Sequence, residues 1–470
     1  MADLDLAYQP ASALAARIRR KELSPVELMD NVLARIAEVN PQANCFCFVY
    51  PEEARAAARA AEAAVMQGAP LGPLHGVPIA FKDMTPTRGK RTTLGSCAFE
   101  HWVPDHDAVV VRRLAAAGAI MVGKTTTSEF AATGITETTL WGVTRNPWNL
   151  GHTPGGSSGG AGAAVAAGCV PLAEGCDMGG SVRIPAAFCG VVGLKPSFGR
   201  IPFDILPSQF DSYCHFGPLA RSVADAALFL RAAEGPDLDD ISSLPPAPAI
   251  PDPLPRSVAG LRLALSTDLG YYAVDPEIAA NLRAVAALLR DRGAIVEEVE
   301  LGLTREINDI GYRHWNVYTA VIAGPHLARW RDVMDPFVVQ MAEAGLKMDA
   351  VSFKQLECDR TAQWRKLAPL FRSHDALLCP TTSIPAPPTG VSDGDFGFDD
   401  AAGRYHQYEM TFPFNLFSAC PALSMPSGFA ASGLPTAVQI VGRPHADATV
   451  LTIGAALEAA TPHLSRRPPL

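Results

Sequence analysis

The sequence predicts an α/β fold in which helices cover a central mixed β-sheet within one large domain. Several observations favour this fold. Hydrophobic residues make up 48% of the 470 residues and charged residues 19%, a composition that fills a large core. Short apolar runs alternate along the chain with segments of helical periodicity. Only one segment resembles a linker, so we expect a single domain over residues 1–470.

Short apolar runs bounded by turn residues are predicted to be buried strands of the sheet. They lie at residues 77–81, 119–122, 261–265, 376–378 and 437–441. Longer segments with apolar residues three and four apart are predicted to be helices. These lie at residues 108–117, 222–233 and 276–292. Alternation of strands and helices in this order places helices on the faces of a largely buried sheet.

Two further segments are assigned from their caps and composition. Residues 1–66 are predicted to form an N-terminal helical segment. One of its helices begins after Ser24, with Pro25 at the first helical position and Glu27 completing a capping box. Residues 235–256 contain seven prolines and are predicted to form an extended surface connection between two halves of one fold.

The charge balance and the cysteine pattern exclude several classes of protein. The 39 basic and 48 acidic side chains give a net charge of −9, so no cationic excess is available to bind nucleic acid. No apolar stretch approaches the ~20 residues that cross a bilayer, and the first residues lack the features of a secretory signal, so we expect a cytoplasmic protein. The ten cysteines include no CxxC pair and HExxH is absent, so we expect no disulfides, no metal and no cofactor.

Residues 118–125 match the phosphate-binding pattern GxxxxGK(S/T), which would indicate a nucleotide-binding protein. A phosphate loop needs a flexible backbone with free N–H groups after a strand. Here the four middle residues, 119–122, are apolar and are predicted to be the strand itself, and a predicted helix precedes them. We therefore disfavour the nucleotide-binding interpretation.

Residues 155–159 match GxSxG, the turn that carries the nucleophile of α/β-hydrolases. That turn follows a buried strand, whereas residues 146–154 are rich in Asn, Pro and Gly and are typical of a loop. A flexible Gly/Ser linker is another interpretation. Because 13 of the 50 residues 151–200 are glycine, interspersed with alanine and valine, we instead expect close backbone contacts within a packed region.

Two further segments carry candidates for chemistry. Ser181 follows Gly179 and Gly180, and consecutive backbone N–H groups beside a serine are suited to hold an oxyanion. Lys82 ends a predicted strand, and the alternation of side chains places Asp83 on the other face. A lysine taken alone is most often a solvated surface group, so its context decides the interpretation.

Together these segments resemble the amidase signature family. Lys82 lies in GVPIAFKD, Ser157 in PGGSSGG and Ser181 in DMGGSVRIPAAFCGVVGLKPS, which are the family's three diagnostic segments in their usual order. Ser157 follows Lys82 by 75 residues and Ser181 follows Ser157 by 24, and both separations are typical of the family. Supporting motifs extend to FNLFSACPALSMPSG at residues 414–428, so the resemblance spans nearly the whole chain.

The resemblance implies a Ser–cis-Ser–Lys triad on an amidase signature fold. Ser181 would be the nucleophile that forms an acyl-enzyme, and Ser157, after a cis peptide bond, would relay protons between Ser181 and Lys82. Lys82 would have to be uncharged, which burial away from carboxylates favours. Nearby backbone N–H groups would hold the oxyanion, and neighbouring side chains would fix the serine loops. The implied oxyanion residues are Met178, Gly179 and Gly180, and the implied supporting residues are Ser158, Asp177 and Arg183.

The resemblance also implies the substrate class, a small-molecule amide or a related carbamate, urea or ester. We expect a pocket lined by Phe130, Thr153 and Ile184, with the aromatic stretch 312–318, that favours an apolar or aryl acyl group. Some family members are instead the glutamine-hydrolysing subunit of tRNA-dependent amidotransferases, and this alternative stays open. Residues 311–371 lack the GFGxExxRR-like stretch usual in those subunits, which favours a stand-alone enzyme. A binding-only homologue and a homodimer also stay open.

Overall fold

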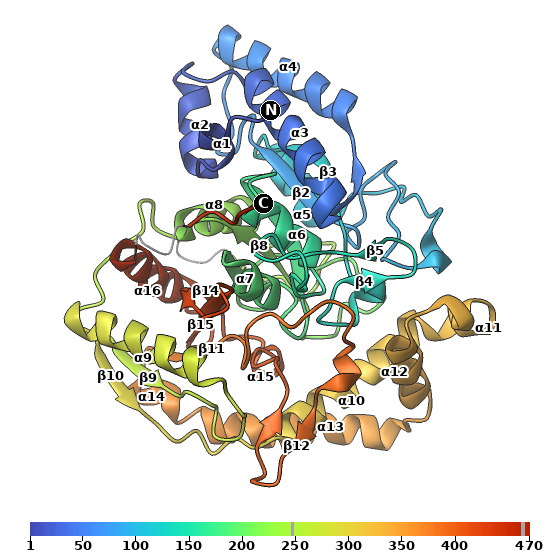
Figure 1. Ribbon diagram of the computed structural model, residues 1–470, viewed down its shortest axis with the longest axis vertical. Coiled ribbons are helices and arrows are strands. Elements are labelled where there is room, and N and C mark those ends of the chain that lie inside the picture. Colours follow the sequence, from blue (N-terminus) through green and yellow to red (C-terminus); the bar gives the residue numbers. More distant parts are fainter. Residues whose placement is uncertain (246–248, 462–465) are drawn as a thin grey trace.

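The computed structural model describes residues 1–245, 249–461 and 466–470, and it confirms the predicted fold class (Figure 1). The described residues form an 11-stranded sheet and two separate two-stranded ribbons. The ribbons pair β4 (Glu137–Thr138) with β5 (Gly142–Val143), and β12 (Phe398–Asp399) with β13 (Tyr405–His406). Across the large sheet the order is β1 (Phe46–Val49), β3 (Ile120–Thr125), β2 (Pro78–Lys82), β6 (Leu172–Asp177), β8 (His215–Ala220), β7 (Val192–Lys195), β14 (Ala422–Phe429), β15 (Pro435–Gly442), β11 (Ala376–Pro380), β9 (Arg262–Leu265) and β10 (Ile295–Glu298).

The large sheet is mixed, as predicted. Strand β2 runs parallel to β3 and β6, and β9 runs parallel to β10 and β11. The remaining neighbours in the sheet are antiparallel. All five predicted strands are present, as β2, β3, β9, β11 and β15. The remaining strands were not predicted. Some are short, and others lie in the glycine-rich region or in the family motifs, where the apolar periodicity that marks a strand is weak.

Helices surround the sheet, and the four predicted ones correspond to α3, α5, α8 and α9. Ser24 caps α3 as predicted, because its side chain accepts hydrogen bonds from the N–H groups of Val26 and Glu27. The predicted capping box is not completed, because no hydrogen bond joins the Ser24 N–H to the Glu27 side chain among the described residues. The helices are α1 (Leu4–Ala7), α2 (Ala11–Arg19), α3 (Pro25–Ala43), α4 (Pro51–Gln67), α5 (Val109–Ala116), α6 (Gly159–Ala166), α7 (Arg183–Cys189), α8 (Val223–Ala233), α9 (Pro276–Asp291), α10 (Glu306–Ile322), α11 (Leu327–Trp330), α12 (Pro336–Leu346), α13 (Ala350–Leu367), α14 (Leu370–Ser373), α15 (Pro413–Leu416) and α16 (Asp447–Ala460). Short 3-10 turns lie at Cys97–Phe99, Glu129–Ala131, Gly324–His326, Arg331–Val333 and Asp393–Asp395.

Two hydrophobic cores lie on opposite faces of the sheet, as the alternation along β2 requires. Ile79 and Phe81 pack into one core with residues of α5, α8, α9 and α16. Ala80, between them, packs into the other core with residues of α3, α4, α6 and α7. The N-terminal segment is therefore not only helical, because it also contributes β1 to the edge of the sheet beside β3.

Helix α6 explains the glycine-rich region. It is apolar on every side and all its residues are buried, which is the pattern of a helix inside a core. A Cβ atom on Gly160 would lie 2.5 Å from the Thr126 nitrogen and 2.6 Å from the Cys45 carbonyl oxygen, so a larger residue would push the backbones apart. The predicted close approach of the backbone is thus confirmed at this helix.

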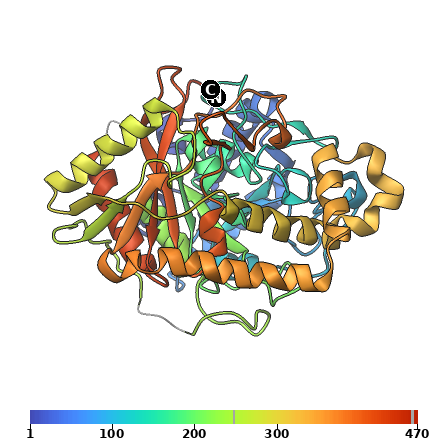
Figure 2. The ribbon, with the colours of Figure 1, turned by 90° about the horizontal axis from the view of Figure 1, so that it is seen from below.

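A group of helices lies beside the main body and completes the wall of the site described below. Helix α10 packs against α12 and α13, and a third apolar cluster joins α10, α13 and α15 to β9 and β11. Figure 2 shows the long orange helix α13 running across the molecule below the sheet. This arrangement brings α10 close to the motif loops that are contributed by the first half of the chain.

The described parts of the proline-rich connection, residues 235–245 and 249–256, contain neither helix nor strand, and residues 246–248 of that prediction lie outside the described residues. No helix within the described ranges is long and apolar enough to cross a membrane.

Candidate active site

Lys82 and Ser157 meet in the interior of the protein. Lys82 is the last residue of β2, and Ser157 lies in the loop before α6. Both side chains are fully buried, and a hydrogen bond of 2.6 Å joins Lys82 Nζ to Ser157 Oγ. The peptide bond between Gly156 and Ser157 is cis. A Cβ atom on Gly156 would lie 2.8 Å from the Thr133 carbonyl oxygen, so the packing leaves room only for glycine before this serine.

Ser181 lies on the turn between β6 and α7, beside the loop of Ser157. The Ser158 N–H donates a hydrogen bond of 3.2 Å to the Ser181 carbonyl, which ties the two loops together. Ser181 keeps 7% of its surface exposed, whereas Lys82 and Ser157 have none. Of these three side chains, Ser181 is therefore the one that a molecule in the adjoining cavities reaches first.

The turn before Ser181 presents backbone donors. Along the described chain, no hydrogen bond uses the N–H groups of Gly179, Gly180 or Ser181. The Thr411 hydroxyl donates a hydrogen bond of 2.6 Å to the Gly179 carbonyl. In a planar trans peptide the carbonyl and the following N–H point in opposite directions, so the Gly180 N–H points away from Thr411. Gly180 has φ +135°, and a Cβ atom there would lie 2.0 Å from Thr411 Oγ1. These donors are suited to hold a negatively charged oxygen next to Ser181.

A buried ion pair supports the same turn. Both oxygens of Asp177 accept from the Arg183 guanidinium, at 2.8 and 3.0 Å, and one also accepts from Asn415 Nδ2 at 2.9 Å. Both charged side chains are fully buried. Burial favours the neutral acid, but the Arg183 charge and these hydrogen bonds outweigh it and hold the pKa of Asp177 well below its usual range. Asp177 also accepts from the Val182 N–H at 3.2 Å, so the pair spans the turn that carries Ser181.

The expectation that Lys82 lies away from carboxylates needs a correction. Asp83 does face elsewhere and accepts from the Thr93 N–H at 2.9 Å. Glu174 on β6, however, is fully buried and accepts from the Lys82 backbone N–H at 3.0 Å and from Thr85 Oγ1. Burial raises the pKa of Glu174, and this carboxyl group lies beside the backbone of Lys82. Alternation along β2 identified Asp83 but could not reveal a neighbour from another strand.

Cys176 is a further contact of Lys82 that the sequence analysis did not identify. Its Sγ atom lies 3.2 Å from Lys82 Nζ, and burial raises the pKa of the thiol, which keeps it uncharged. Ser158 Oγ donates to the Cys176 carbonyl at 3.4 Å. The sequence signal was its position directly before Asp177 in a diagnostic motif.

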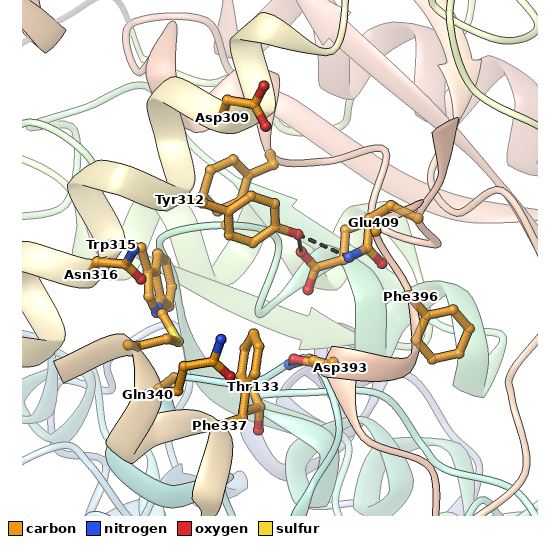
Figure 3. A pocket seen from close by; sticks show the side chains of 18 of the residues that line it. Thr133, Asp309, Tyr312, Trp315, Asn316, Phe337, Gln340, Asp393, Phe396 and Glu409 are labelled. Atoms are coloured by element: carbon orange, nitrogen blue, oxygen red, sulfur yellow. Dashed lines mark hydrogen bonds between the residues drawn. The ribbon is translucent and has the colours of Figure 1, made fainter. Parts of the chain in front are cut away.

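Two cavities meet at Ser181. The larger has a volume of about 330 Å³ and is bordered by Gly179, Ser181 and side chains of α10, α12 and the loop 393–412 (Figure 3). The smaller has about 30 Å³ and is bordered by Ser157, Ser181, Cys176 and apolar side chains. Ser157 borders the smaller cavity but not the larger. Ser181 thus lies between a larger cavity, lined by both polar and apolar groups, and a smaller, mostly apolar one.

The predicted pocket residues have different positions. Ile184 borders the larger cavity and Phe130 borders the smaller. Thr153 borders neither, because its hydroxyl accepts from the Gly155 N–H at 3.1 Å inside the preceding loop. The aromatic stretch contributes as expected, since Tyr312 and Trp315 line the larger cavity.

Polar side chains of the larger cavity were not foreseen. Asp393 and Glu409 project into it from the loop between β11 and α15 (Figure 3). Burial and the neighbouring Asp393 raise the pKa of Glu409 to about 8, and burial raises the pKa of Asp393 to about 6. The sequence offered one signal for Glu409. It is the single carboxylate within the largely apolar run 408–414, which lies directly before a family motif.

The competing motifs are explained by the fold. Residues 120–125 form β3, and α5 precedes them, so the phosphate-loop pattern lies on a strand that is paired on both sides. Lys124 is buried and donates to the Thr85 carbonyl at 2.6 Å. The GxSxG pattern follows a loop and not a strand. Among the residues that the structure describes, no three His, Cys, Asp or Glu side chains group in a way that could hold a metal ion.

Comparisons with known proteins agree with this fold. A family model described as Amidase matches residues 27–451. A glutamyl-tRNA(Gln) amidotransferase subunit of Synechococcus sp. (strain CC9605) is 38% identical over 487 residues, covering 97% of each chain. An acylamidase of Rhodococcus erythropolis is 36% identical over 478 residues, covering 100% of this chain and 98% of the relative. The crystal structure of a bacterial aryl acylamidase superimposes with a TM-score of 0.92 at 29% identity, covering 98% of each chain.

A mixed sheet enclosed by helices is thus shared with an enzyme of the amidase signature family. The chain belongs to the amidase family. It is accordingly an enzyme that hydrolyses carbon–nitrogen bonds of amides.

Proposed function

We propose that the protein hydrolyses a small-molecule amide, with carbamates, ureas and esters as chemically related substrates, through an acyl-enzyme on Ser181. The observation that carries the proposal is the buried hydrogen bond of 2.6 Å between Lys82 and Ser157, next to Ser181. Through this hydrogen bond the Lys82 amine is placed to take the proton of Ser157, which is the role of a base.

Acylation begins when Ser181 Oγ attacks the carbonyl carbon of the amide. The Ser181 proton passes to Ser157 Oγ, and the Ser157 proton passes to Lys82 Nζ. The carbonyl oxygen becomes an oxyanion, which the N–H groups of Gly179, Gly180 and Ser181 stabilise. The carbon–nitrogen bond then breaks, and the proton returns from Lys82 through Ser157 to the leaving nitrogen. The acyl group is left as an ester on Ser181.

Deacylation uses the same groups in the same order. A water molecule attacks the ester carbon and gives its proton to Ser157, while Lys82 takes the Ser157 proton. The bond between the acyl carbon and Ser181 Oγ breaks, and the proton returns through Ser157 to Ser181. The products are a carboxylic acid and the free enzyme.

The two cavities support an orientation for the substrate. The leaving nitrogen must face Ser157, and Ser157 borders only the smaller cavity. The larger cavity, of about 330 Å³, suits the acyl part, and the leaving group then lies on the side of the smaller cavity. Amides of medium-sized acids fit this arrangement.

The alternative is the glutamine-hydrolysing subunit of a tRNA-dependent amidotransferase, which the 38% identity to one such protein keeps open. Glutamine carries a carboxylate that needs a cationic partner. In the described lining of the larger cavity, Arg305 is the only Lys, Arg or His, and it already pairs with Asp399 and, at 3.5 Å, with Asp309. This charge distribution favours the stand-alone amidase.

The experiment that tests the proposal is a hydrolysis screen of aryl amides, alkyl amides, carbamates and glutamine with the purified chain alone. We expect turnover of alkyl or aryl amides without added proteins. Hydrolysis of glutamine only, and only when partner proteins are added, would instead support the alternative.

A further inference from the structure

The larger cavity contains two carboxyl groups with few partners. Glu409 is only 9% exposed, and its Oε2 atom accepts from the Tyr312 hydroxyl at 3.1 Å. Asp393 accepts from the Gly134 N–H at 2.7 Å and from the Tyr408 hydroxyl. Figure 3 shows both carboxyl groups directed into the space between α10 and the opposite loops.

The carboxyl groups of Asp393 and Glu409 have more hydrogen-bond acceptors than the surrounding residues have donors. The Tyr408 hydroxyl lies beside Glu409 as well as Asp393, but it has a single hydrogen, which it donates to Asp393. The Oε1 atom of Glu409 therefore has no hydrogen-bond donor among the described residues. When both carboxyl groups are ionised they offer about eight lone pairs, and three donors reach them here. The unused acceptors face the cavity and suit a ligand that brings several donors.

Aromatic rings complete the surroundings of the carboxyl pair. Tyr312 and Phe412 stack with centroids 5.0 Å apart, and Trp315 lies 5.9 Å from Phe412. Phe396 borders the same cavity. Aromatic faces next to carboxylates stabilise an organic cation through cation–π attraction and charge. A neutral apolar ligand would use the rings but leave the carboxyl groups without partners.

The carboxyl pair lies within reach of a substrate bound at Ser181. Thr411 contacts the Gly179 carbonyl, and Glu409 precedes Thr411 by two residues. Ser181 and Glu409 border the same cavity, so one acyl chain lying in that cavity extends from Ser181 towards Glu409. An amine at the end of such a chain would meet Glu409 while its carbonyl carbon meets Ser181.

We infer that the preferred substrate is an amide whose acyl part ends in a protonated primary amine, held by Glu409 with Asp393 beside it. An ammonium brings three donors to the unused acceptors and a positive charge to the carboxyl pair. The inference rests on the proposed function, because it names the acyl group that the same site accepts. It makes Glu409 a specificity-determining residue, since it contacts the substrate away from the reacting atoms.

The charge of Glu409 sets a pH dependence for this recognition. The groups that face it are Asp393, Tyr312, Tyr408 and, at longer range, Asp177. Burial and Asp393 raise the pKa of Glu409 to about 8, so below that pH the free enzyme holds a proton there. An ammonium favours the carboxylate, and its own pKa of ~10.4 keeps it charged. Recognition of the ammonium therefore strengthens as pH rises to about 8 and then levels.

The test compares two primary amides of equal size, 5-aminopentanamide and hexanamide, by the ammonia that each releases. They differ only in a terminal ammonium against a methyl group. We expect the specificity constant of 5-aminopentanamide to exceed that of hexanamide by roughly 10- to 100-fold, the range for a hydrogen bond between charged groups. The ratio of the two constants is expected to rise between pH 6.5 and about 8.

Two variants assign the effect to its residue. Glu409→Gln keeps the acceptor for the Tyr312 hydroxyl and removes the charge, so the ratio is expected to fall roughly 10- to 100-fold and to lose its pH dependence. Glu343→Gln is the matched control, because Glu343 lies on α12, pairs with Arg331 and does not border the larger cavity. For Glu343→Gln, the ratio of the specificity constants of the two amides is expected to equal the ratio for the unchanged protein.

The outcomes separate this inference from the proposed function. Equal hydrolysis of both amides, or a preference that Glu409→Gln leaves intact, would overturn the inference and leave the amidase proposal standing. If the protein hydrolysed aryl amides but neither of the two test amides, the inference would also be overturned and the amidase proposal would stand. Failure to hydrolyse any amide would overturn the proposed function and the inference with it.

Discussion

Replacing Asp177 by Asn tests whether the buried ion pair holds the turn that carries Ser181. The substitution keeps the shape of the side chain but removes the charge that Arg183 faces. Asn also turns one acceptor into a donor. At the position of Oδ1 this donor opposes the Arg183 bond of 2.8 Å and the Asn415 bond of 2.9 Å, and at the position of Oδ2 it opposes the Arg183 bond of 3.0 Å. No other carboxylate forms an ion pair with Arg183 among the described residues, so its charge would remain buried without compensation.

The size of the effect follows from the burial of the pair. Both side chains are fully buried, and breaking such a pair from one side costs about 3–5 kcal/mol. The variant is thus expected to lose about 3–5 kcal/mol in free energy of unfolding at neutral pH. The loss is expected to shrink as pH falls below ~4, because the folded protein holds the pKa of Asp177 below its unfolded value and a protonated Asp resembles Asn.

The assay combines urea unfolding, followed by tryptophan fluorescence, with kcat/KM on a hydrolysed amide. Asp447→Asn is the matched control. Asp447 is buried, pairs with Arg200 at 3.2 Å and accepts from Ser197 at 2.7 and 2.9 Å, and neither it nor its partners border the two cavities. Both variants are expected to lose stability to a similar extent, but only Asp177→Asn is expected to lose more than tenfold in kcat/KM.

Equal kcat/KM in Asp177→Asn and the unchanged protein, under conditions where both are folded, would contradict the expectation that the ion pair holds the turn. It would mean that the turn keeps its backbone donors in place without the ion pair. An equal loss of kcat/KM in both variants would also refute it, because the effect would then follow from general destabilisation.

The remaining predictions concern the catalytic groups and the rejected motifs. Ser181→Ala and Lys82→Ala are each expected to lower kcat by at least ~10³-fold with unchanged circular dichroism, because members of one catalytic unit fail together; near-normal turnover in either would contradict the assigned roles. EDTA is expected to leave activity unchanged, since no step uses a metal, and loss of activity that zinc restores would reveal a metal site. ATP at millimolar concentration is expected not to shift the melting temperature, because Lys124 is buried and bonded to the Thr85 carbonyl; a rise of several degrees would revive the nucleotide-binding interpretation.

The sequence predicted those parts of the fold whose signals are local. The helix at Pro25 follows from a Ser cap and apolar residues on one face, and the strand at Ile79 follows from an apolar run between turns. Strand β6 has the sequence LAEGCD, with Glu174 inside it, and no apolar pattern marked it. Its pairing with β2 and β8 comes from tertiary contacts that no single segment contains.

The candidate site divides in the same way. Lys82, Ser157 and Ser181 stand in motifs that a single sequence displays, and the structure brings Lys82 and Ser157 to 2.6 Å. Glu174 and Cys176 reach Lys82 across neighbouring strands, which alternation along one strand cannot reveal. Glu409 is 228 residues beyond Ser181 in the sequence and shares its cavity only because the loop before α15 folds back over the turn. Residues contributed by distant loops are those that sequence reasoning missed.

Mass spectrometry of a rapidly acid-quenched reaction identifies the hydroxyl that carries the acyl group of the substrate. With an amide or ester substrate in steady turnover, digestion is expected to yield a peptide in which Ser181 bears the acyl mass, and Ser181→Ala is expected to yield none. An acyl mass on Ser157 or on another residue, or efficient turnover by Ser181→Ala, would contradict the account.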